Sequence, residues 1–137
     1  MTKRISILGV TGSIGVNTVD VIEHWGVHRF ETVAVTGNSN VARLADSARR
    51  LQAEIAVTAD GTKLEELRAA LAGSGIEAAA GEAALVEAAS RPVDWVMSAI
   101  VGAAGLRPTL AAAGTGATVA QANKECLVAA GPVFLAE

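Results

Sequence analysis

The chain has 137 residues, of which 51% are hydrophobic and 18% are charged, and its formal net charge is −3 at pH 7. This length is typical of one domain, and the composition excludes a disordered protein because enough apolar surface can be buried to offset the entropy lost on folding. The small negative charge removes any general electrostatic attraction to nucleic acid or to an anionic membrane. The single cysteine, Cys126, excludes an internal disulfide framework.

The sequence predicts neither a secretory leader nor a membrane-spanning helix. The apolar run that follows Lys3 and Arg4 is too short for the core of a signal peptide. Residues 108–123 lack Lys and Arg but consist mainly of Ala, Gly and Thr, whose transfer into lipid is weak. We therefore expect a cytoplasmic protein that acts neither on a membrane nor on nucleic acid.

The chain alternates short β-rich runs with longer helical patterns, which is typical of βαβ units and of a parallel sheet covered on both faces. The expected strands are residues 5–8, 30–36, 54–57, 76–80 at an edge, 93–99 and 117–120. The expected helices are residues 13–25, 41–51, 62–72, 82–89, 106–113 and 125–135. We predict one α/β domain over residues 1–137, with a three-layer, doubly wound, Rossmann-like fold and a mostly parallel sheet.

The sharpest motif is Gly-Val-Thr-Gly-Ser-Ile-Gly at residues 9–15, between the first expected strand and the first expected helix. Glycines at such a turn let the backbone approach a pyrophosphate, while the N–H groups and the positive dipole end of the helix attract its charge. The spacing is G-x-x-G-x-x-G, and a glycine turn that opens a helix can also be purely structural. Its place in the first βα unit favours nucleotide binding.

The end of the second expected strand indicates which dinucleotide is bound. NAD-binding folds place a carboxylate there for the ribose 2′-hydroxyl, whereas this chain has the neutral residues Asn38, Ser39 and Asn40. Arg43 follows one turn into the next helix, which Asn40 can cap. These residues favour NADP over NAD, although a plain polar loop with a helix cap explains them too.

Two further segments follow later strands, at the edge where open α/β sheets hold ligands. Lys124, within Ala-Asn-Lys-Glu at 122–125, can pair with a substrate phosphate, and Asn123 can bind a carbonyl or amide. A solvated helix start is the alternative. The small residues at 98–105 could let a flat ring lie against the backbone, or could equally serve close helix packing.

Three other residues carry weaker signals for chemistry. Cys126 is expected to be a small buried hydrophobe, and His24 and His28 are expected to flank a helix end. No Ser/His/Asp set, carboxylate pair or metal-ligand cluster is evident in the sequence.

Three segments together resemble one family, the 1-deoxy-D-xylulose 5-phosphate reductoisomerases. They are residues 7–15, residues 99–110 (Ala-Ile-Val-Gly-Ala-Ala-Gly-Leu-Arg-Pro-Thr-Leu) and residues 122–128 (Ala-Asn-Lys-Glu-Cys-Leu-Val). The resemblance covers the whole chain in order and is to the amino-terminal domain. It implies an NADPH-dependent enzyme that uses a divalent metal, Mg or Mn. That enzyme converts 1-deoxy-D-xylulose 5-phosphate to 2-C-methyl-D-erythritol 4-phosphate in non-mevalonate isoprenoid biosynthesis.

The resemblance also implies roles for individual residues, carried over by position. The pyrophosphate group would be held by Thr11, Gly12, Ser13 and Ile14. The adenosine 2′-phosphate would be surrounded by Gly37, Asn38, Ser39 and Asn40. Asn123 and Glu125 would face the cofactor, and Lys124 would lie at the substrate.

Two departures from the family pattern concern these roles. Val10 stands where a serine is usual, which should matter little because backbone groups bind the pyrophosphate. Asn38 and Ser39 stand where many members have glycine followed by a basic residue or serine, so Arg43 becomes the candidate substitute for a charge on the 2′-phosphate.

The family's metal ligands and its flexible substrate loop have no counterpart before Glu137. We therefore expect the cofactor-binding domain of a homodimeric parent enzyme, without catalytic or metal-binding residues of its own, that binds NADPH but turns over no substrate. Two alternatives stay open. One is another NADP oxidoreductase with a G-x-T-G-x-x-G turn, of the aspartate-semialdehyde dehydrogenase kind, and the other is a stand-alone nucleotide-binding module.

Overall fold

A computed structural model describes residues 3–10, 13–26, 29–98 and 106–121 of the chain. The strands are β1 (Lys3–Leu8), β2 (Phe30–Gly37), β3 (Ile55–Thr58), β4 (Glu77–Ala80), β5 (Trp95–Ser98) and β6 (Thr118–Gln121). The helices are α1 (Ser13–Trp25), α2 (Val41–Leu51), α3 (Leu64–Ala70), α4 (Glu82–Ala89) and α5 (Leu106–Ala113), and the 3-10 turn η2 (Gly61–Lys63) precedes α3. The helix expected over residues 125–135 lies outside the described residues.

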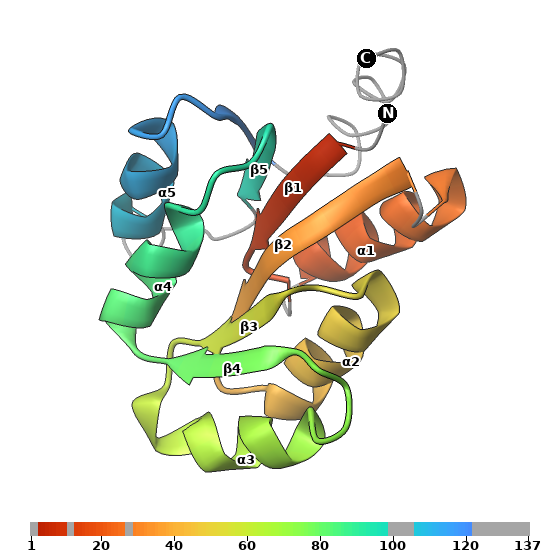
Figure 1. The fold of residues 1–137 in the computed structure, drawn as a ribbon, viewed down its shortest axis with the longest axis vertical. Coiled ribbons are helices and arrows are strands. Elements are labelled where there is room, and N and C mark those ends of the chain that lie inside the picture. Colours follow the sequence, from red (N-terminus) through yellow and green to blue (C-terminus); the bar gives the residue numbers. More distant parts are fainter. Residues whose placement is uncertain (1–2, 11–12, 27–28, 99–105, 122–137) are drawn as a thin grey trace.

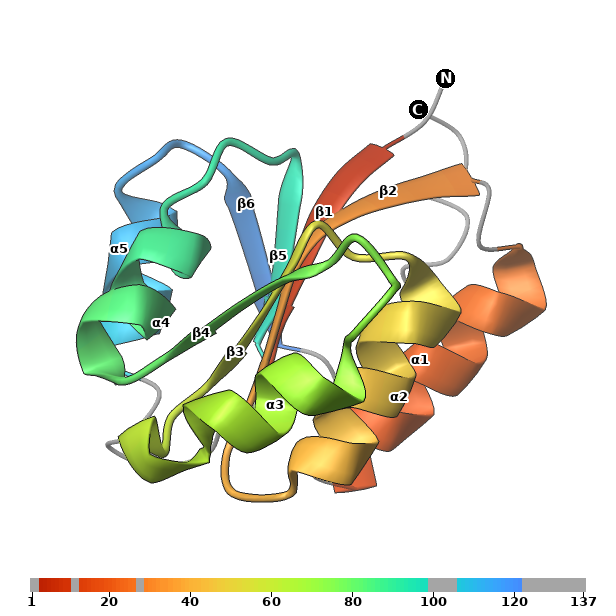
Figure 2. The same cartoon turned by 60° about the horizontal axis from the view of Figure 1, so that its bottom comes forward.

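The strands form one sheet in the order β4-β3-β2-β1-β5-β6, and all of these neighbouring strands pair in parallel (Figure 1). The chain moves outward from β1 to β4, then returns to the other side of β1 for β5 and β6. Right-handed crossovers therefore place α1, α2 and α3 on one face of the sheet and α4 and α5 on the other (Figure 2). This is the predicted three-layer, doubly wound fold, with a described sheet that is parallel throughout.

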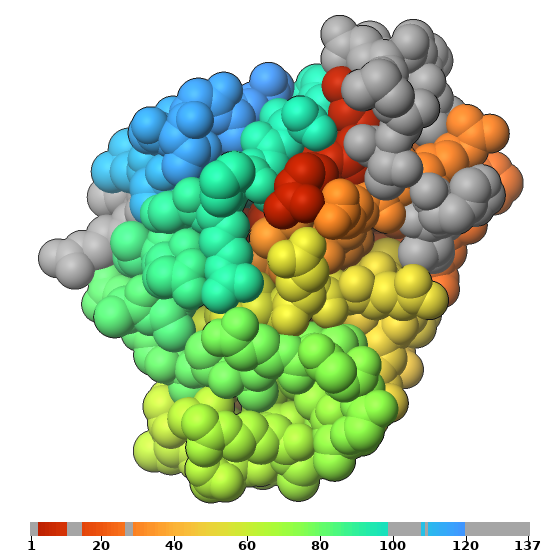
Figure 3. Space-filling view, viewed as in Figure 1, coloured from red at the N-terminus to blue at the C-terminus, as the bar shows by residue number. Residues whose placement is uncertain are grey.

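Each face of the sheet has its own buried apolar layer, because successive side chains of a strand point to opposite faces. Ile5 and Ile7 of β1 pack with residues of α1, α2 and α3, whereas Leu8 packs with Ala89 of α4 and Ala112 of α5. Figure 3 shows α4 and α5 side by side on that second face. Small alanines at these contacts let the helices come close to the sheet, as the alanine-rich, aromatic-poor sequence predicts.

Helix α3 differs from its prediction at both ends. Asp60 accepts hydrogen bonds from the Thr62 N–H (3.0 Å) and hydroxyl (2.6 Å), and the chain there forms the tight turn η2 before the α-helix begins. At the other end the Arg49 guanidinium of α2 binds the carbonyls of Ala70 and Ala72. In the part of the chain that the structure describes, no helix is both long and apolar enough to cross a bilayer.

Candidate cofactor site

The candidate site lies at the carboxyl edge of the sheet, where the turns after β1, β2 and β3 are neighbours. Because α1 follows β1 on one face and α5 follows β5 on the other, the strand order reverses between β1 and β5. Open α/β sheets bind ligands in the crevice at such a switch point. In Figure 2 the loop from β2 into α2 lies at this edge, at the bottom of the view.

The turn after β1 is fixed by the end of β2. Gly9 has a φ of 84°, which an L side chain rarely adopts, so the turn requires a glycine there. Its N–H binds both the Thr36 hydroxyl (2.9 Å) and the Thr36 carbonyl (3.1 Å), and the Val10 N–H binds the same carbonyl at 2.7 Å. Val10 is fully buried in the core beside α1. The departure from serine at this position thus places an apolar side chain in the core.

The third glycine of the motif lets helix α1 approach this turn. A Cβ on Gly15 would lie 2.5 Å from the Val10 carbonyl carbon and 2.6 Å from its Cα, and would also collide with the Gly9 carbonyl oxygen. All three neighbours are backbone atoms, which cannot rotate away. The amino end of α1 is therefore pressed against the carboxyl end of β1, the arrangement in which helix N–H groups meet a bound anion.

The end of β2 at Gly37 is buried, and the exposed loop of residues 38–40 that leads into α2 is held by hydrogen bonds. Gly37 accepts a hydrogen bond from the Ala59 N–H at 2.8 Å, and Asn38 from the Thr58 hydroxyl at 2.6 Å. The Ser39 carbonyl binds the Val41 N–H at 2.9 Å. Asn40 caps α2, its side-chain oxygen accepting the Arg43 N–H at 3.2 Å. The predicted cap is thereby confirmed.

The charges around this edge favour an anion at two helix starts. Neither α1 nor α2 has an acidic residue in its first turn, so the positive dipole ends of both helices are uncompensated there. Arg43 lies in the first turn of α2 with its side chain exposed. Asp60 is the acidic residue that follows the end of the neighbouring strand β3. Its pKa is lowered chiefly by the hydrogen bond that it accepts from the Thr62 hydroxyl.

The described residues include only part of the predicted site. Gly37 ends β2, Asn38, Ser39 and Asn40 form the loop that follows it, and residues 13 and 14 begin α1 as expected. The remaining predictions concern Thr11, Gly12, Asn123, Lys124 and Glu125, and these residues lie outside the described part, as do residues 99–105.

Sequence reasoning missed the hydroxyls of Thr36 and Thr58. Thr36 ends the second expected strand, and its buried hydroxyl accepts a hydrogen bond from the Gly9 N–H of the turn after β1. The third expected strand ended at Val57, whereas β3 continues to Thr58. The one signal in the sequence for this extra residue was its β-branched side chain, which favours strands.

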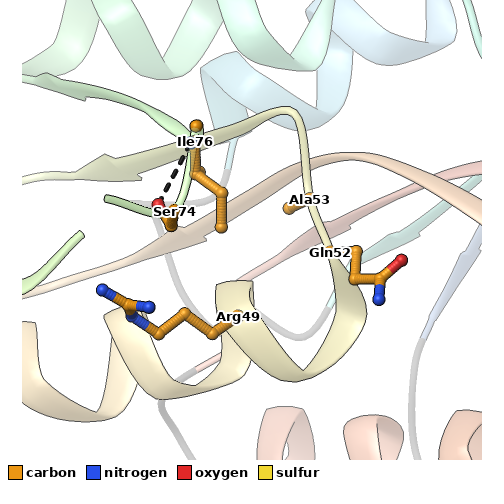
Figure 4. Close-up of a pocket in the computed structure, with 6 residues that line it drawn as sticks. Arg49, Gln52, Ala53, Ser74 and Ile76 are labelled. Carbon is orange, nitrogen blue, oxygen red and sulfur yellow. Dashed lines mark hydrogen bonds between the residues drawn. The ribbon is translucent and has the colours of Figure 1, made fainter. Parts of the chain in front are cut away.

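The described residues bring no three His, Cys, Asp or Glu side chains together as a metal site. A cavity of about 430 Å³ lies at the opposite edge of the sheet and is lined by Arg49, Gln52, Ala53, Ser74, Gly75 and Ile76 (Figure 4). Its lining residues come just before β3 and β4 or from the end of α2. The Arg49 guanidinium is engaged by the carbonyls of α3, so this cavity does not offer a free cation from that side chain.

The all-parallel sheet, the helices on both faces and the glycine turn at the switch point define a doubly wound, Rossmann-like α/β domain. A family model described as 1-deoxy-D-xylulose 5-phosphate reductoisomerase matches residues 5–131. The chain belongs to this family.

Curated relatives and solved structures agree with the family model. The 1-deoxy-D-xylulose 5-phosphate reductoisomerase of Jannaschia sp. is 62% identical over 135 residues, which are 98% of this chain and 34% of the relative. That of Sinorhizobium fredii is 60% identical over 134 residues, 97% of this chain and 34% of the relative. This chain therefore spans about a third of the length of these relatives.

Two solved reductoisomerases share the fold. The Zymomonas mobilis enzyme in complex with NADPH has a TM-score of 0.86 and 51% identity, over 98% of this chain and 35% of the other. A DOX-P reductoisomerase in complex with NADPH, fosmidomycin and magnesium has a TM-score of 0.80 and 39% identity, over 98% of this chain and 33% of the other.

Proposed function

We propose that this chain is the NADPH-binding domain of a reductoisomerase that converts 1-deoxy-D-xylulose 5-phosphate to 2-C-methyl-D-erythritol 4-phosphate. Family membership over residues 5–131 carries the proposal and favours it over an oxidoreductase of the aspartate-semialdehyde dehydrogenase kind. The domain spans residues 1–137 and acts within a longer, homodimeric, cytoplasmic enzyme. Its partners are NADPH and a phosphorylated sugar.

The pyrophosphate of NADPH binds at the start of α1, on residues Thr11 to Ile14. Two observations support this position: the close approach that Gly15 permits, and the absence of acidic side chains from the first helical turn. Backbone N–H groups and the helix dipole can supply the attraction without a basic side chain. This explains how Val10 can serve the core instead of the ligand.

The adenosine 2′-phosphate binds at the start of α2, against Gly37 to Asn40. This loop has no carboxylate, and its exposed residues are held in place by hydrogen bonds to β3 and α2. Arg43 supplies the positive charge, because its guanidinium is exposed and α2 presents its dipole end beside it. A bound 2′-phosphate discriminates NADPH from NADH.

NADPH, once bound, supplies a hydride for the reductive half of the reaction. The task of this chain is to orient that group, since fixing the pyrophosphate and the 2′-phosphate leaves the nicotinamide end directed along the carboxyl edge. Asn123 and Glu125 would line the cofactor and Lys124 would pair with the substrate phosphate. We assign the divalent metal to other parts of the enzyme, because the family's metal ligands have no counterpart in this sequence.

The test is calorimetric titration of the 137-residue chain with NADPH and, separately, with NADH. We expect NADPH to bind at least tenfold more tightly, since NADH lacks the 2′-phosphate. We also expect no NADPH oxidation when the pentulose phosphate and Mg²⁺ are added. Equal affinity for the two nucleotides, or binding of neither, would overturn the proposal. Turnover by this chain alone would contradict the assignment of the metal site elsewhere.

A further inference from the structure

Thr58, the last residue of β3, joins the turn after its own strand to the loop after β2. Its side chain is fully buried, and both hydrogen-bonding roles of its hydroxyl are used. The hydroxyl donates to the Asn38 carbonyl at 2.6 Å and accepts the Asp60 N–H at 3.2 Å. A group that is buried and doubly bonded cannot move without leaving both partners unpaired.

These bonds matter because Asn38, Ser39 and Asn40 are exposed and make no apolar core of their own. An exposed polar loop ordinarily loses conformational freedom when it binds a ligand, and that loss weakens binding. Here the Thr58 hydroxyl fixes the carbonyl of Asn38 before any ligand arrives. A buried residue of the neighbouring strand β3 therefore helps to fix the conformation of this loop.

Another buried threonine, in the neighbouring strand β2, offers a comparison. Thr32 lies in β2, is 2% exposed, and its hydroxyl has no hydrogen-bond partner among the described residues. Both threonines suit a buried strand, so strand propensity explains the presence of either. Of these two hydroxyls, that of Thr58 binds the loop that follows β2.

We propose that Thr58 is a positioning residue that holds the Asn38–Asn40 loop in the conformation that receives the 2′-phosphate and so sets the preference for NADPH over NADH. This inference rests on the proposed function. Thr58 does not itself contact the nucleotide; it acts through the Asn38 backbone.

The test is the affinity of the full chain for NADPH and NADH with Thr58→Val, Thr58→Ser and Thr32→Val. Thr58→Val keeps the shape of the side chain but removes the hydroxyl, and should weaken NADPH binding about tenfold. Its effect on NADH should stay below about twofold, since NADH has no 2′-phosphate. Thr58→Ser restores the hydroxyl and should recover NADPH binding. Thr32→Val is the matched control and should leave both affinities unchanged.

Circular dichroism and a cooperative urea transition establish that each variant is folded. Should Thr58→Val not fold, Thr58→Ala removes the same hydroxyl and carries the same expectation. The inference is overturned if Thr58→Val binds NADPH as the unaltered chain does, or if it loses NADPH and NADH by the same factor. An unaltered chain that binds neither nucleotide would instead refute the proposed function, and the inference with it.

Discussion

Gly15 lies where the start of α1 packs against the turn after β1, and there is no space for a side chain at this position. The three heavy atoms nearest to a Cβ placed on Gly15 are backbone atoms of Gly9 and Val10, which cannot rotate away. The glycine is thus needed for close packing of α1 on β1, a requirement distinct from the positive φ that selects glycine at Gly9.

We expect Gly15→Ala to lower the free energy of unfolding by about 3 kcal/mol, because the added methyl overpacks a rigid contact. NADPH binding should weaken as well, since the start of α1 must move. Urea denaturation measures the first effect and calorimetric titration the second. Gly61→Ala is the control, because a Cβ there meets nothing within 4 Å. A Gly15→Ala variant as stable as the Gly61→Ala variant would contradict the packing described here.

The hydrogen-bond partners of the buried threonines Thr32, Thr36 and Thr58 could not be predicted from the sequence. All three lie in similar β-rich runs. The Thr32 hydroxyl has no partner among the described residues, the Thr36 hydroxyl accepts the Gly9 N–H, and the Thr58 hydroxyl donates to the Asn38 carbonyl. The difference depends on which strands pair and in what register. Those contacts join residues 20 to 27 positions apart, beyond the reach of local pattern.

At the scale of elements, the start of α2 combines a helix cap with a candidate phosphate site. Asn40 contributes to both through different atoms: its side-chain oxygen caps the helix, while its amide N–H groups stay available as donors. A substitution that keeps the cap but adds charge therefore separates stability from binding.

We expect Asn40→Asp to keep the free energy of unfolding within about 0.5 kcal/mol of the original, since aspartate caps helices as well as asparagine does. NADPH affinity should fall about tenfold, because a carboxylate would face the 2′-phosphate. NADH affinity should hardly change. Asn40→Ala, by comparison, should cost about 1 kcal/mol of stability. Unchanged NADPH affinity in Asn40→Asp would place the 2′-phosphate elsewhere.

Arg91, just after helix α4, forms ion pairs with Glu87 of α4 and with Glu77 of the edge strand β4. Glu87 accepts two hydrogen bonds of 2.8 Å from Arg91, and Arg91 also lies 3.5 Å from Glu77 of β4. The hydrogen bonds from Arg91 lower the pKa of Glu87, against the opposing effect of desolvation. A carboxyl whose pKa is lower in the folded state stabilises the fold at neutral pH, and the stabilisation is lost as the pH falls through that lowered value.

Glu87→Gln should therefore lower the free energy of unfolding at pH 7 by a few tenths of a kcal/mol, because the pair is partly solvent-screened. The difference from the original chain should shrink as the pH falls through the lowered pKa of Glu87 and vanish below it, where the carboxyl is protonated in both states. Urea titrations at several pH values measure it. Glu65→Gln is the comparison: it breaks an i,i+3 pair with Arg68 whose glutamate side chain is 83% exposed, and it should change stability less than Glu87→Gln. A difference independent of pH would show that the effect is not electrostatic.

Element boundaries were most predictable where glycine and proline punctuate the sequence. Residues 13–25, 82–89 and 106–113 form helices as predicted, each beside a glycine-containing turn or with Pro108 in its first turn. The 62–72 helix was wrong at its ends because Asp60 and Arg49 bind it from outside the pattern. A local side-chain cap sets the first end and long-range hydrogen bonds from Arg49 set the second, and hydrophobic periodicity encodes neither.

For the whole molecule, the order of the strands decides what the site can be. Placing β1 at the centre brings the turn after β1 and the loop after β2 to the same edge, one strand apart. Two helix starts without acidic side chains then face that edge together. NADPH carries a pyrophosphate and a separate 2′-phosphate, and the proposed function assigns one of them to each helix start. The βαβ alternation predicted a doubly wound, mostly parallel sheet because it allows few topologies, whereas the strand order itself comes from the structure.

The most direct test of the account is to map the NADPH contacts on the whole chain by nuclear magnetic resonance. We predict that titration shifts the backbone amide signals at the start of α1 and of residues 38–43. The signals of Gln52, Gly75 and Ile76 at the cavity on the opposite edge should stay unchanged. Shifts concentrated around that cavity, or an NADPH titration that leaves the amides of both helix starts unmoved, would contradict the placement of the cofactor.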